Sequence, residues 1–131
     1  MKQMLDKLKS MVQSLEKKHG SITLAALFLR EGSLKKWDIV ISSSWLSSSK
    51  KESYEIVISE VQSILTSDEF IQLSRVVILD NTDLAVSFLQ EVCPLTNGGI
   101  KESPKDFSVE PLSAKFGFVI EKAYILRCQK T

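Results

Sequence analysis

The stretch Trp37-Asp-Ile-Val-Ile-Ser-Ser-Ser-Trp45 contains the sharpest change of character in the chain. A run of three β-branched apolar residues, Ile39 to Ile41, gives way to serines and a closing tryptophan. A short apolar run bounded by turn-forming residues is typical of a strand that is buried on both faces. We therefore predict a central buried strand that leads into a polar loop and then into a helix.

Two elements are expected before this strand. Apolar residues recur at helical spacing from Met1 to Leu15, and Gly20 follows three basic residues, which predicts an amphipathic helix over about residues 2–19. Its apolar stripe could pack on the chain's own sheet or form a dimer seam. The sheet is favoured, because a coiled coil needs about three or four heptads. Ser21 to Leu29 is apolar on both alternations and predicts a strand in an antiparallel hairpin with the strand at Trp37.

A strand, helix and strand unit is expected downstream. Ser49 and Glu52 have the spacing of a capping box, which predicts a helix that starts there and ends near Ser67. Val76 to Leu79 is a further apolar run and predicts a third buried strand. Elements of these lengths form a right-handed crossover, so the strands at Trp37 and Val76 should be parallel neighbours.

The last third of the chain combines one helix with weaker strand signals. A helix is expected over about Asp83 to Val92, followed by a polar loop over about residues 97–111. Phe116 to Ile120 and Ala123 to Cys128 predict either one bent strand or two short strands. The fold class predicted is α/β (or α+β), a single domain with a mixed sheet of about four to five strands and about three helices.

Composition excludes several classes of protein. The chain has 131 residues, 44% of them hydrophobic and 25% charged, with a formal net charge of +1. These values are typical of one soluble folded domain and far from those of disordered chains. A nucleic-acid binder normally presents a clustered basic face, and the pairs Lys35-Lys36 and Lys50-Lys51 are expected at opposite ends of a strand. No nucleic-acid interface is evident.

Localisation is predicted from cysteine usage and the absence of long apolar runs. Cys93 and Cys128 have no CxxC spacing, so we expect buried, reduced thiols rather than a disulfide scaffold. The first residues lack the unbroken apolar region of a signal peptide, and no apolar run approaches the ~18 residues of a membrane span. The prediction is a cytoplasmic protein with no membrane segment.

Polar side chains should gather where the two parallel strands end. Ligands of open α/β sheets bind outside the carboxyl ends of parallel strands. The candidate site, which we call the serine rim, comprises Ser42, Ser43, Ser44, Trp45, Asp80, Asn81 and Asp83. Serines and amides before a helix could bind an anion, although such serines are more commonly helix caps.

Cofactors and classical catalysis have little support in the residue inventory. Asp80 and Asp83 could hold Mg²⁺, but capping of the following helix is the more common role of aspartates at such a position. No cofactor is therefore predicted, and Mg²⁺ is the alternative. The single histidine, His19, lies among lysines, and there is no GxSxG motif and no zinc-ligand pair. Asp38 is expected to face an edge or to pair with Lys35, Lys36 or another surface cation. Trp45 is expected to anchor a ligand or partner.

Two functions follow from these observations. The favoured one is a non-enzymatic cytoplasmic protein-interaction or regulatory module, with a protein partner or self-association, including a homodimer. The alternative is a small metal-assisted or anion-binding enzyme that acts on a phosphorylated substrate at the serine rim.

Overall fold

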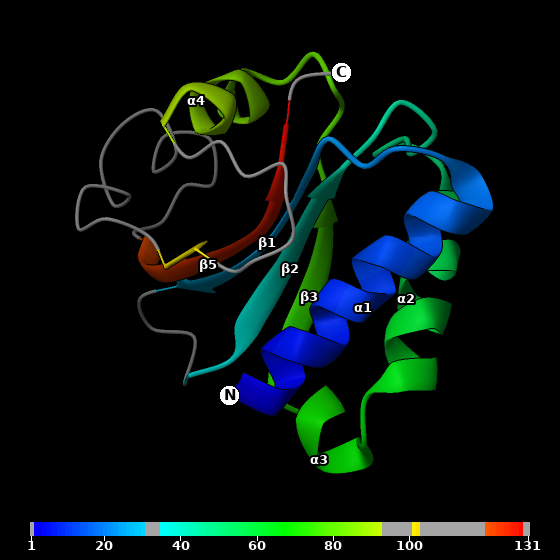
Figure 1. The fold of residues 1–131 in the computed structure, drawn as a ribbon, viewed down its shortest axis with the longest axis vertical. Coiled ribbons are helices and arrows are strands. Elements are labelled where there is room, and N and C mark those ends of the chain that lie inside the picture. Colours follow the sequence, from blue (N-terminus) through cyan, green and yellow to red (C-terminus); the bar gives the residue numbers. More distant parts are fainter. Residues whose placement is uncertain (1, 31–34, 93–100, 103–119, 130–131) are drawn as a thin grey trace.

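A mixed β-sheet with the strand order β3-β2-β1-β5-β4 organises the molecule (Figure 1). The computed structural model describes residues 2–30, 35–92, 101–102 and 120–129. The strands are β1 (Leu24–Arg30), β2 (Trp37–Ser42), β3 (Leu73–Ile78), β4 (Lys101–Glu102) and β5 (Ile120–Cys128). The helices are α1 (Lys2–His19), α2 (Lys51–Ile64), α3 (Ser67–Phe70) and α4 (Leu84–Val92).

The pairing of the first three strands is the predicted one. β1 and β2 form an antiparallel hairpin in which Ala26 lies opposite Val40. β2 and β3 are parallel neighbours joined through α2, so the predicted β-α-β crossover is confirmed. All six residues of β2 are buried, although β1 rather than β2 occupies the middle of the sheet.

Helices cover both faces of this sheet. α1 and α2 pack on one face, where the residues of α1 and β2 share one apolar cluster, and α4 packs on the other (Figure 1). The buried stripe of α1 is the predicted one, comprising Met4, Leu5, Leu8, Met11, Val12 and Leu15. The stripe therefore packs inside the chain's own core. No helix within the described ranges combines the length and apolarity needed to cross a bilayer.

The predicted capping box at the start of α2 is wrong. The N-cap of α2 is Lys50, one residue after Ser49, and Lys50 makes no side-chain capping bond. A capping box does occur at Thr66, whose hydroxyl accepts from the Glu69 amide at 3.2 Å while the Thr66 amide donates to the Glu69 carboxylate at 2.9 Å. It starts α3, a short helix that the apolar pattern did not predict because its side chains are not buried.

The predicted third strand is present, but it is longer than predicted and only partly buried. β3 begins three residues earlier than predicted and is the last strand of the sheet on its side, with Ser74 and Arg75 exposed. A run of β-branched residues cannot distinguish an interior strand from an edge strand, because both present apolar side chains to the layers above and below.

The C-terminal strand follows one of the two predicted alternatives. β5 runs without interruption through Glu121-Lys122 and pairs with β1, with irregularities in register. Lys101 and Glu102 pair with β5 as β4, so two residues of the predicted polar loop are strand instead. Most of residues 97–111, and Phe116 to Val119 of the predicted strand, lie outside the described residues.

Candidate functional site

The two halves of the serine rim lie side by side, as the parallel pairing of β2 and β3 requires. The Ser42 hydroxyl at the end of β2 donates to Asn81 Oδ1 at 3.0 Å. Further along, Asp80 Oδ1 accepts from the Ser48 amide at 3.1 Å, and Asp80 Oδ2 accepts from the Ser48 hydroxyl at 2.8 Å. The sequence therefore located this meeting point correctly, although it did not include Ser48.

Most polar groups of the serine rim bind other parts of the fold. Ser42 and Ser43 are buried, and the Ser43 hydroxyl donates to the Ser21 carbonyl at 2.8 Å. Asp83 Oδ1 accepts from the Ala85 amide at 2.9 Å and so caps α4. Ser44 is exposed. Asp83 therefore has the capping role that is the alternative to metal binding, and the buried serines connect strands to loops.

Asp80 has a specific consequence for anion binding. Its carboxylate lies against the loop that precedes α2, where it accepts from the backbone amide and the hydroxyl of Ser48. An anion at a helix N-terminus would use loop amides and hydroxyls of this kind. The protein's own carboxylate thus occupies two of the donors that a bound phosphate would need, and it would repel a phosphate electrostatically.

Trp45 connects the polar loop to the end of α1. Its indole Nε1 donates to the Gly20 carbonyl at 3.0 Å, and its ring stacks on His19 with centroids 4.7 Å apart. Gly20 has φ +123°, a conformation that side chains disfavour, which explains why the helix ends there. Trp45 therefore has a structural role, and part of its ring remains accessible.

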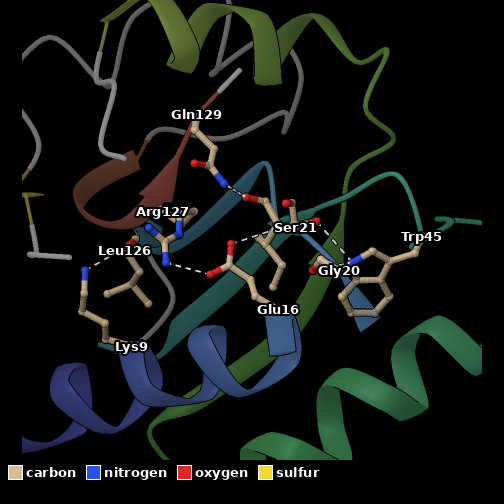
Figure 2. A network of polar contacts seen from close by, with 9 residues as sticks. Lys9, Glu16, Gly20, Ser21, Trp45, Leu126, Arg127 and Gln129 are labelled. Atoms are coloured by element: carbon tan, nitrogen blue, oxygen red, sulfur yellow. Dashed lines mark hydrogen bonds and ion pairs between the residues drawn. The ribbon is translucent and has the colours of Figure 1, made fainter. Parts of the chain in front are cut away.

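A second polar cluster, shown in Figure 2, joins α1 to β5 at the same end of the sheet. Glu16 Oε1 accepts from Arg127 Nη2 at 2.7 Å, and Glu16 Oε2 accepts from the Ile22 amide at 3.1 Å. The Ile22 carbonyl accepts from Gln129 Nε2 at 2.9 Å. We call these residues the α1–β5 network: Glu16, Ile22, Arg127 and Gln129.

The α1–β5 network was not predicted from the sequence. Glu16 sits next to the buried Leu15 on α1, and Arg127 interrupts the apolar run of β5. The charged residue within an apolar strand was the available signal, because such a charge requires a partner. Its partner is 111 positions away in sequence, and only the packing of α1 on β5 brings the two together.

Lys9 lies beside this network on α1. Its ammonium donates to the Leu126 carbonyl at 3.4 Å. Burial, and secondarily the positive charge of Arg127, lower the pKa of Lys9 below its ordinary value, while Glu16 opposes that shift.

An open hollow of about 690 Å³ along α1 is lined, within the described residues, by Ser10, Gln13, Ser14, Glu16 and Lys17. The lining carries both a negative and a positive side chain, Glu16 and Lys17. Among these described lining residues, no hydrogen bond joins a serine to a base, so the hollow has no support as a catalytic site.

Asp38 pairs with a cation from a neighbouring strand. Its side chain is only 2% exposed, and Oδ2 lies 3.3 Å from Arg75 Nε on the neighbouring strand β3. Of the predicted alternatives, pairing with a surface cation is confirmed, and that cation is Arg75. The register of β2 and β3 places Asp38 opposite Arg75, which a reading of one strand alone cannot show.

A further surface with exposed apolar residues lies along α2, α3 and β3. Ile58 is 37% exposed and Ile71 is 65% exposed. Ile58, Phe70 and Leu73 line a hollow of about 160 Å³ against β3, and Ile71 lines an adjoining hollow with Phe70. We call this region the β3 edge surface: Ile58, Phe70, Ile71, Leu73 and the outer edge of β3.

Comparisons with known proteins give no functional lead. Neither protein-family models, nor curated proteins, nor solved structures match the chain. Within the described residues, no three His, Cys, Asp or Glu side chains are grouped as a metal site. A functional inference therefore depends on the surfaces of this chain alone.

Proposed function

We propose that the chain is a non-enzymatic, cytoplasmic protein-interaction or regulatory module that contacts its partner through the β3 edge surface. The observation that carries this proposal is the exposure of Ile58 and Ile71 around apolar hollows at the side of the sheet. Exposed apolar residues around hollows at the surface are typical of sites that bind other proteins.

The contacts of the serine rim support the same proposal. The hydroxyls of Ser42 and Ser43 and the carboxylate of Asp80 all form hydrogen bonds within the fold. Catalysis requires acid, base or nucleophile groups that can reach a substrate. Groups that hold loops and helix ends in place favour a structural role for this end of the sheet.

Site-specific photocrosslinking in cells tests the proposal. A photoreactive phenylalanine analogue in place of Ile71 is expected to form a discrete crosslinked species, because this side chain is already mostly exposed. The matched control is the same analogue in place of Leu84 on α4, which is 78% exposed and lies on the other side of the sheet. Crosslinks from both positions alike, or from neither, would contradict the proposal.

The alternative function is the small metal-assisted or anion-binding enzyme at the serine rim. The observation in its favour is that Asp80 is exposed and lies beside the loop that leads into α2. This alternative expects Mg²⁺ together with a phosphate compound to raise the melting temperature, and Asp80→Ala to abolish the rise. An unchanged melting temperature across a metal and metabolite screen would eliminate it.

A further inference from the structure

We draw no further inference here: the strongest candidate, the apolar hollow of about 160 Å³ that Ile58, Phe70 and Leu73 line between α2, α3 and β3, carries none, because nothing in the structure shows what covers it.

Discussion

The serine rim and the β3 edge surface differ in how their side chains are used. At the serine rim, Ser42, Ser43 and Asp80 bond to other parts of the same chain. At the β3 edge surface, Ile58 and Ile71 are left exposed although apolar side chains gain from burial. The comparison teaches that a concentration of polar residues in a sequence need not mark a functional site, whereas apolar side chains that gather around hollows at the surface can mark a binding site.

The largest expected effect of a substitution on stability is in the α1–β5 network. Glu16→Ala should lower the free energy of unfolding by about 3 kcal/mol, because it leaves Arg127, 11% exposed, without its carboxylate partner. Chemical denaturation measures this change. The matched control is Glu60→Ala, which removes the ion pair to the more exposed Lys18 and should cost about 0.5 kcal/mol. Equal costs would show that the α1–β5 network adds little beyond a surface ion pair.

A smaller effect is expected at Asp80. Asp80→Ala should destabilise the fold by about 1–2 kcal/mol, because the Ser48 amide and hydroxyl lose their common acceptor. Hydrogen exchange should show faster exchange of the Ser48 amide, while the α1 amides change little. An unaffected exchange rate of the Ser48 amide would mean that Asp80 does not hold this loop. It would then favour a ligand-binding role for Asp80.

Thr23 allows a test in the opposite direction at the same end of the sheet. Its hydroxyl is buried and has no hydrogen-bond partner among the described residues. Thr23→Val removes this unsatisfied group at nearly constant shape, so we expect thermal denaturation to show a gain of about 0.5–1 kcal/mol. A loss of similar size would indicate that the hydroxyl is hydrogen-bonded in solution, for example to a buried water.

The β3 edge surface should contribute little to the stability of the monomer. Ile71→Lys is expected to change the free energy of unfolding of the monomer by less than about 0.5 kcal/mol, because the side chain is 65% exposed. Chemical denaturation at low protein concentration measures this value. A loss of several kcal/mol would place Ile71 in the core and remove the contrast between the two regions.

The smallest effect concerns pH. The hydrogen bond from Lys7, at 2.7 Å, and then that from the Thr66 backbone, lower the pKa of Glu69 from its ordinary value of 4.5. The folded state therefore releases this proton more readily than the unfolded state, so Glu69 stabilises the fold above pH 4.5 and loses this effect as pH falls through the lowered pKa. Glu69→Gln should show a shallower loss of stability in an acid titration from pH 4.5 downward. An unchanged slope would contradict the pairing with Lys7.

The candidate site illustrates both the success and the limit of prediction from sequence. The meeting of Ser42 with Asn81 followed from two apolar runs separated by one helix, because such runs form parallel neighbours. The use of those side chains could not be predicted, since it depends on backbone groups such as the Ser21 carbonyl that other elements contribute.

Local signals were misleading where tertiary contacts decide the outcome. Ser49 and Glu52 have capping-box spacing, yet α2 begins one residue later, next to a loop that is bound by Asp80. β3 has the composition of an interior strand but lies at one end of the strand order. This position could not be predicted, because the residues of a strand do not determine whether another strand pairs with it.

The sequence by itself determined the elements and their local pairing: the buried stripe of α1, the antiparallel β1–β2 hairpin and the parallel β2–β3 crossover. These depend on periodicity and short connections, which are local properties of a chain. Only the tertiary structure decided that Glu16 meets Arg127, that Asp38 meets Arg75, and that Ile58 and Ile71 remain exposed. Such outcomes depend on which elements are neighbours in space, and the packing of layers fixes that choice.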